Sequence, residues 1–136
     1  PAQVAAIMGR VVRENPDNVR ALQLLGAARF EAGDTVGAAS ALRRVLAIEP
    51  EDAETWSRLG ESLTVANKEV IGADAEAAFR RAVALDPNQF GARYFLGDMA
   101  LKRGAQDEAK AWWTPVIETL EPSDPRRAEL LKRLNP

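Results

Sequence analysis

The sequence predicts an all-α fold in which antiparallel helix pairs stack into a superhelix of about eight helices. A short pattern, a large side chain with Leu-Gly three positions later, begins at Leu22, Trp56 and Arg93. Each copy follows a corner that starts with proline, at Pro16, Pro50 and Pro87, so the period is 34 and then 37 residues. No segment shows the alternating apolar pattern of a strand. A period of this length is typical of solenoids, whose units bury their cores against one another.

The composition fits one soluble domain over residues 1–136 and excludes several classes of function. Hydrophobic residues make up 46% and charged residues 28%, with a net charge of −2. This balance lacks the basic stripe of a nucleic-acid-binding protein. The chain has no cysteine and no histidine, which excludes disulfides, thiol chemistry and the commonest general base and metal ligand. No apolar run approaches the ~20 residues of a membrane helix, so we expect no membrane contact by this part of the protein.

The leading segment, residues 1–15, is predicted to form an amphipathic helix that ends before Pro16. Its apolar side chains recur at helical spacing, at Val4, Ile7, Met8, Val11 and Val12. Two interpretations remain open: the second helix of a partial repeat, or a capping helix. An exposed Val4, Ile7 and Val11 face would also allow homo-oligomers.

The first repeat is predicted over residues 17–50. Its first helix carries Leu22, Leu25 and Gly26, and Gly33-Asp34 marks the break before a second helix. The second repeat, residues 51–87, matches the pattern best and has three additional residues between its helices, around 67–72. An insertion there belongs in a loop, where it costs little. We expect either a contact loop or a neutral insertion.

The third repeat, residues 88–122, is more degenerate. Arg93 replaces the usual large apolar residue, and Pro115 inside the second helix predicts a kink near residues 111–115. Residues 123–136 are predicted to form a capping helix, because Asp124 followed by Pro125 is a favourable helix start.

Aromatic side chains are predicted to serve mainly the core. Trp56, Phe79 and Trp113 fall at positions that pack between helices, whereas Trp112 is either packed or an exposed contact. Helical spacing turns Tyr94 toward the concave groove, where it would form an apolar floor with Phe30 and Leu101. Ordinary packing between neighbouring helices explains Tyr94 equally well.

No residue pattern predicts catalysis, a cofactor or a metal site. The sequence has neither a phosphate-binding glycine loop nor a nucleophile elbow, so we expect no enzyme, no catalytic residue and no cofactor. The predicted site is instead a peptide-binding groove along the first helices, at Arg20, Gln23, Phe30, Arg58, Glu61, Tyr94, Asp98 and Leu101. Because Glu61 and Asp98 would repel an acidic peptide end, we disfavour a clamp for a C-terminal carboxylate.

The period, the Leu-Gly pattern and the closing prolines resemble tetratricopeptide repeats. More narrowly, the chain resembles the periplasmic domain of CycH/CcmI-type cytochrome c biogenesis proteins. The resemblance is carried by three stretches: Asn15–Asn18, Glu61–Asn67 with the insertion before Phe79, and Ala92–Gly97 followed by Gly104 and Trp112-Trp113. The sequence departs from that family at Lys68–Ile71, where a glycine-rich insertion is commoner, and at Pro115.

That resemblance implies a non-enzymatic chaperone that holds unfolded apocytochrome c, chiefly by its C-terminal helix, for the haem-ligation machinery. It also implies a periplasmic location and a membrane anchor in the full-length protein, while the sequence itself is silent on the compartment. Since the chain begins at Pro1, we expect a fragment or a mature form. The alternative is a general repeat scaffold that assembles another protein complex.

Overall fold

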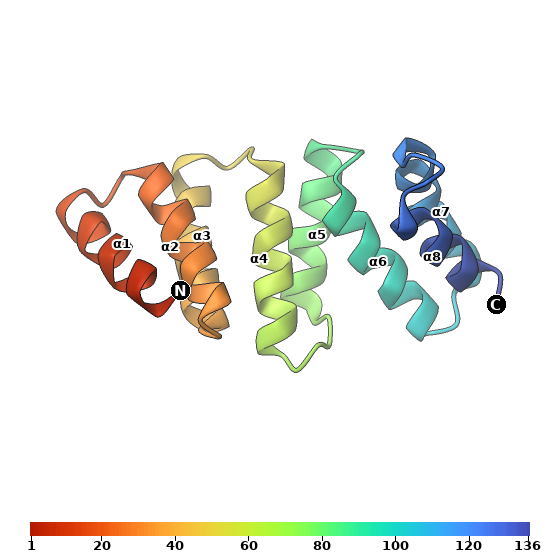
Figure 1. Cartoon of the computed structure of the whole chain (residues 1–136), viewed down its shortest axis with the longest axis horizontal. Helices are drawn as coiled ribbons and strands as arrows, with labels where there is room; N and C mark the ends of the chain where they lie inside the picture. The colour runs from red at the N-terminus through yellow and green to blue at the C-terminus, as the bar shows by residue number, and fades with distance from the viewer.

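Eight α-helices make up the chain and follow one another along an arc (Figure 1). The computed structural model describes residues 1–136. The helices are α1 (Ala2–Glu14), α2 (Val19–Glu31), α3 (Thr35–Ile48), α4 (Ala53–Ala66), α5 (Ala73–Leu85), α6 (Phe90–Lys102), α7 (Gln106–Thr119) and α8 (Pro125–Leu134). With eight helices and no strand, the predicted all-α solenoid is confirmed. None of the helices is long and apolar enough to span a membrane.

Helices pair as α2 with α3, α4 with α5 and α6 with α7, and a glycine lies at the centre of each pair. A Cβ added to Gly60 would lie 2.6 Å from the Phe79 ring, and one added to Gly97 would lie 2.0 Å from Trp113 Nε1. Phe79 and Trp113 are completely buried. The two glycines therefore let α4 and α6 approach a large aromatic ring on the following helix. Because each pair lies within one predicted repeat, we propose repeat limits of 17–50, 51–87 and 88–122.

The corner before each first helix recurs with the same chemistry. Two residues after the prolines at 16, 50, 87 and 122, a side-chain oxygen accepts the N–H of a residue in the first turn, which caps helices α2, α4, α6 and α8. The caps are Asn18, Asp52, Gln89 and Asp124. The capping helix α8 thus begins in register with the three repeats.

The proline carbonyl at each of the first three corners also accepts a side-chain N–H. Trp56 Nε1 donates to the Pro50 oxygen at 2.8 Å. Arg93 Nε donates to the Pro87 oxygen from the equivalent position. The arginine therefore keeps the hydrogen bond of the tryptophan that it replaces, which explains why the repeat tolerates it.

Helix α7 continues without a break through Pro115, and the predicted kink there stays a prediction. In helix α1, Val4 and Ile7 are about half-exposed, whereas Val11 packs against the first core cluster. The insertion forms the turn between α4 and α5, where Lys68 and Glu69 both adopt positive φ, 56° and 65°. Because the left-handed backbone conformation is unfavourable for residues other than glycine, this turn holds backbone strain.

Candidate binding groove

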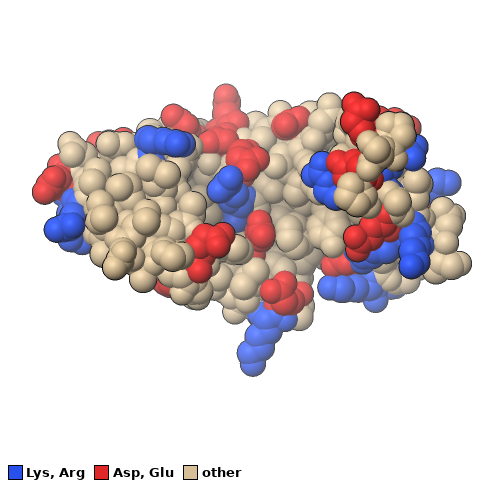
Figure 2. Space-filling model, viewed as in Figure 1, with Lys and Arg blue, Asp and Glu red and all other residues tan.

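Two adjoining pockets form a groove on the concave side of the arc. The larger one, called the central pocket below, has a volume of about 430 Å³ and opens between α2, α4 and the start of α6. The second, of about 310 Å³, lies between α2 and α4 and shares Glu54 and Arg58 with the first. In the view of Figure 2, acidic side chains gather over the middle of the molecule beside a basic one.

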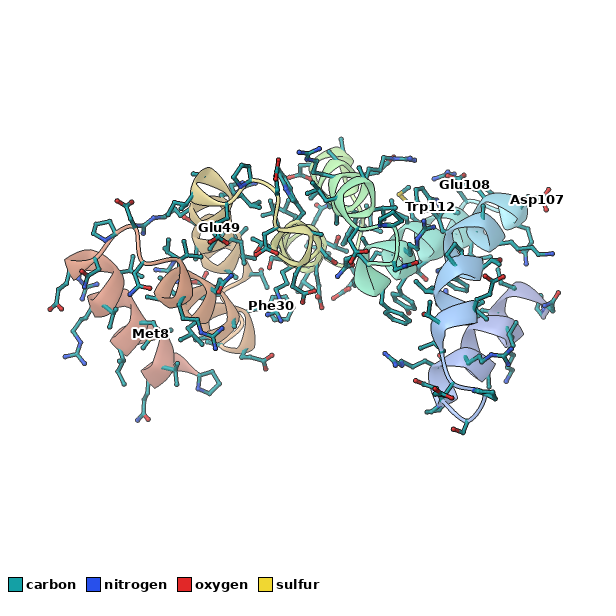
Figure 3. All side chains as sticks on the ribbon, turned by 90° about the horizontal axis from the view of Figure 1, so that it is seen from above. Met8, Phe30, Glu49, Asp107, Glu108 and Trp112 are labelled. Atoms are coloured by element: carbon teal, nitrogen blue, oxygen red, sulfur yellow. The ribbon has the colours of Figure 1, made fainter.

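Phe30 contributes to the groove an aromatic side chain that does not serve the core. Its ring is half-buried, lines the central pocket and belongs to none of the four apolar core clusters. Figure 3 shows it pointing into the hollow of the arc, whereas Glu108 lies on the other side of the ribbon. Large aromatic rings that are accessible in a concave site are typical anchors for a protein partner.

The charges of the central pocket sum to an acidic surface. Arg58 Nε donates to Glu54 at 3.0 Å, and Gln89 donates to the other oxygen of Glu54 at 3.1 Å. Glu31 and Glu61 also line the pocket and have no ion-pair partner. The pocket thus contains three carboxylates and one guanidinium, and that guanidinium already pairs with Glu54.

Burial raises the pKa of Glu61 above its ordinary value. Arg58 opposes this effect, while Glu69, Glu54 and Glu31 add to it by repulsion. The direction of the shift means that the protein supplies too little positive charge to stabilise the ionised carboxylate.

Ser57 adds a hydrogen-bonding group that the fold does not use. Its side chain is only 6% exposed and lines the central pocket. Its hydroxyl forms no hydrogen bond within the chain, unlike Thr64, whose hydroxyl donates to the Gly60 carbonyl at 2.8 Å. Gly91 makes room for it, since a Cβ there would lie 2.8 Å from Ser57 Oγ.

On the third repeat, the corresponding surface of α6 is occupied by α8. Arg133 pairs with Asp98 and donates to the Tyr94 hydroxyl at 3.3 Å, and its guanidinium lies 4.9 Å from the Trp113 ring centre. Lys102 reaches the other oxygen of Asp98 at 2.9 Å. Burial raises the pKa of Asp98, but the hydrogen bonds from Arg133 and Lys102 outweigh it and lower the pKa below its ordinary value.

The structure divides the eight predicted groove residues into two sets. Five line the two pockets: Arg20, Gln23, Phe30, Arg58 and Glu61. The other three, Tyr94, Asp98 and Leu101, lie on α6 away from the central pocket; Tyr94 and Leu101 pack on the cluster that holds Trp113 and Leu130. Phe30, Tyr94 and Leu101 therefore do not form the continuous apolar floor that the sequence suggested, because α8 takes the space over α6.

Sequence reasoning also missed residues on which the site depends. Phe90 closes the central pocket from the first turn of α6, and Glu31 comes from the last turn of α2. Counting from the corner prolines would have revealed one further residue. The eleventh position after each proline holds Ala27, Glu61, Asp98 and Arg133. Arg133, the partner of Asp98, therefore occupies in α8 the same repeat position that Asp98 occupies in α6.

Trp112 is packed rather than exposed as a contact. Its ring contacts two apolar clusters and lies under the guanidinium groups of Arg80 and Arg93, 5.3 and 5.7 Å from the ring centre. Trp56 is half-buried between two clusters, so it also serves the core.

Two models of the tetratricopeptide repeat match the chain, one over residues 1–63 and one over residues 72–112. Together they cover well over half of it. The chain belongs to the tetratricopeptide repeat family. The first match includes α1, which favours its interpretation as a helix of the repeat pattern.

This tetratricopeptide domain is similar in sequence to two characterised bacterial proteins. It is 31% identical over 106 residues to the cytochrome c-type biogenesis protein CycH of Bradyrhizobium diazoefficiens, covering 78% of this chain and 29% of CycH. It is 27% identical over 134 residues to NrfG of Escherichia coli O157:H7, a subunit of the formate-dependent nitrite reductase complex. That match covers 98% of this chain and 67% of NrfG. The chain thus spans less than a third of CycH and about two thirds of NrfG.

Solved structures share the fold at lower identity. A crystal structure of MamA matches with a TM-score of 0.75 at 23% identity, covering 96% of this chain and 82% of MamA. The first tetratricopeptide domain of Spaghetti (RPAP3), bound to the HSP90 peptide SRMEEVD, matches with a TM-score of 0.71 at 22% identity. It covers 85% of this chain and 91% of that domain.

Proposed function

We propose that this tetratricopeptide domain binds apocytochrome c during cytochrome c maturation, without catalysing a reaction itself. The observation that carries the proposal is the open groove between α2 and α4, where the Phe30 ring serves no core cluster. Tetratricopeptide solenoids use such concave surfaces to hold other proteins. The similarity to CycH, a protein named for cytochrome c-type biogenesis, supports the choice of partner.

The proposed mechanism is capture of an amphipathic helix. The C-terminal helix of apocytochrome c would lay its apolar side chains against Phe30 and the neighbouring apolar lining, including Leu42 and Phe90. Polar groups at the edge, such as Arg20 and Gln23, would set the register of the helix. This is the mode in which an amphipathic helix occupies a groove of a partner. Delivery to haem-ligation components, a periplasmic location and a membrane anchor elsewhere in the protein belong to the same proposal.

Calorimetric titration tests the proposal. The chain is titrated with a peptide from the C-terminal helix of a class I apocytochrome c, and with a scrambled peptide as a control. We expect saturable binding of the native sequence alone. Phe30→Ala should weaken it about tenfold or more, because burying an aromatic ring is worth about 1.5–3 kcal/mol. Val36→Ala, which changes an exposed side chain of α3, is the matched control and should bind as the unchanged chain does.

The second candidate is a scaffold within another protein complex. NrfG favours it, because this subunit of an enzyme complex matches almost the whole chain. Absence of binding to both peptides, with the helices intact by circular dichroism, would contradict the apocytochrome proposal and favour the scaffold.

A further inference from the structure

The second and third repeats place the same two kinds of group at equivalent points of the concave side. Counting from the corner prolines, the seventh position holds Ser57 on α4 and Tyr94 on α6, so both repeats present a hydroxyl. The eleventh position holds Glu61 and Asp98, so both present a carboxylate one helical turn further on.

On the third repeat, this pair of groups holds a guanidinium. Arg133 of α8 donates to both the Tyr94 hydroxyl and the Asp98 carboxylate. Its guanidinium also lies over the ring of Trp113. A hydroxyl, a carboxylate and an aromatic ring together form the arrangement that a planar arginine head recognises best.

On the second repeat, the same groups have no occupant. Ser57 is buried to nine-tenths as a residue and lines the central pocket, and its hydroxyl forms no hydrogen bond within the chain. The Glu61 carboxylate has no ion-pair partner, and Glu31 stands across the same pocket. The single arginine there, Arg58, is held by Glu54. The independent sign of a ligand is the third repeat, where the residues at the same two repeat positions hold the guanidinium of Arg133.

We infer that the central pocket binds the guanidinium of an arginine side chain presented by the partner helix. The inference rests on the proposed function in that it concerns the same groove, and it adds the chemistry of the side chain that the groove selects. The guanidinium would donate to Glu61 and Ser57, and its apolar stem would lie against Phe30 and Phe90. An acidic peptide end is excluded from this pocket, because Glu31 and Glu61 repel it.

Next to Glu61 and Ser57 the charge balance favours a cation over an apolar side chain, while Phe30 and Leu42 still face the apolar side of the partner helix. A purely apolar side chain would bury Glu61 and the Ser57 hydroxyl further without giving them a partner, which is costly for both groups. An arginine supplies both missing hydrogen bonds and neutralises one of the uncompensated charges. Because its donors lie in one rigid plane, it can reach the two acceptors at once, as Arg133 does on α6.

The test uses the whole 136-residue chain, labelled with ¹⁵N, and two small probes. N-acetyl-arginine-N-methylamide carries the guanidinium, while N-acetyl-citrulline-N-methylamide has the same shape without the charge. We expect the arginine probe to shift the amide signals around Ser57, Glu61 and Gly91 in a saturable manner, and the citrulline probe to leave them in place. Glu61→Gln should weaken binding of the arginine probe about tenfold and Ser57→Ala about threefold.

Glu118→Gln is the matched control, because it removes an exposed carboxylate of α7 that lies outside the pocket. It should bind the arginine probe as the unchanged chain does. Equal shifts with both probes, or equal affinity in Glu61→Gln and Glu118→Gln, would overturn the inference.

The two proposals fail separately. Arginine binding in the pocket without binding of the apocytochrome peptide would keep this inference and remove that partner. Binding of the apocytochrome peptide with no effect of the arginine probe would keep the partner and remove the pocket chemistry.

Discussion

The second and third repeats have the same groove chemistry, but one is open and the other is filled by the protein itself. Glu61 and Asp98 occupy the same repeat position. The pKa of Asp98 lies below its ordinary value, although burial opposes this, because Arg133 and Lys102 donate to it. The pKa of Glu61 lies above its ordinary value, first because of burial and then because neighbouring carboxylates repel it. The pKa values of these two carboxylates therefore shift in opposite directions, because only Asp98 accepts hydrogen bonds from cations.

In this solenoid the third repeat is closed by packing that stabilises the fold, while the central pocket stays free for the binding proposed above. Helix α8 begins in repeat register at Asp124 and closes the third repeat with Leu130, Leu134 and Arg133. No helix covers the central pocket, so its carboxylates and the Phe30 ring stay available. Unused polar groups of this kind usually lower stability and are kept where a ligand needs them.

The largest expected effect comes from the helix pair beneath the filled site. In Gly97→Ala the new methyl group would meet Trp113 at 2.0 Å, so α6 and α7 must separate. We expect a loss of about 3 kcal/mol in the free energy of unfolding, measured by urea denaturation. Gly26→Ala is the control, because its methyl group would meet Leu42 at 3.3 Å and the change improves helix propensity. A small change in both variants would contradict the role of Gly97.

The next effect concerns the guanidinium that fills the third repeat. Arg133→Ala leaves Asp98 with Lys102 alone and the Tyr94 hydroxyl without its donor. We expect a cost of about 1–2 kcal/mol and faster amide hydrogen exchange in α8. Lys132→Ala, next to it and exposed, should leave the exchange rates of α8 unchanged. Equal exchange in the two variants would mean that Arg133 does not hold the helix.

Removing the carboxylate charge of Glu61 or of Asp98 should change Tm by a smaller amount, with opposite signs in the two repeats. A raised pKa in the folded state means that ionised Glu61 destabilises the fold above that pKa, and that the penalty disappears below its ordinary value of 4.5. Glu61→Gln should therefore raise Tm by a few degrees at pH 7 and leave it unchanged near pH 3.

Asp98→Asn should behave in the opposite way, because a lowered pKa stabilises the fold above the ordinary value of 3.8, and this is lost as the pH falls through the folded-state pKa. Its Tm should be lower than that of the unchanged chain at pH 7, and the gap should narrow in acid. Thermal melts of the three proteins from about pH 7 to pH 3 measure both changes. A change in Tm of the same sign in both variants at pH 7 would contradict the proposed difference between the two repeats.

The smallest expected effect on stability is that of the groove ring. Phe30 is half-buried and outside the core clusters, so Phe30→Ala should cost less than about 1 kcal/mol. Chemical denaturation measures the loss of stability, with Val36→Ala as the control variant. A loss of several kcal/mol would show that the ring belongs to the core and would weaken its assignment to the groove.

The fold was predictable because its signals are local and periodic. The glycines at 60 and 97, the corner prolines and the capping residues recur at fixed distances within each repeat, and this spacing indicates their roles. The bounds of α1, Ala2–Glu14, also follow from the apolar spacing and from Pro16.

The candidate site was predictable only where no later element covers the groove. Phe30 and Glu61 lie in the pocket that spacing predicts. Tyr94 and Leu101 do not, because the position of α8 depends on packing of Leu130 and Leu134 against α6 and α7. The sequence predicts a capping helix over residues 123–136, but no periodic signal specifies that it buries Leu130 rather than Leu131 or that it covers the groove side of α6.

The difference between the two repeats depends most directly on Glu61 being a counterpart of Asp98 without a bound cation. An NMR titration of the side-chain carboxyl carbons, with and without N-acetyl-arginine-N-methylamide, measures this. We predict a Glu61 pKa above its ordinary value in the free chain, which falls when the probe binds, while the already low pKa of Asp98 does not change. A Glu61 pKa that is ordinary in the free chain and unaffected by the probe would contradict the account.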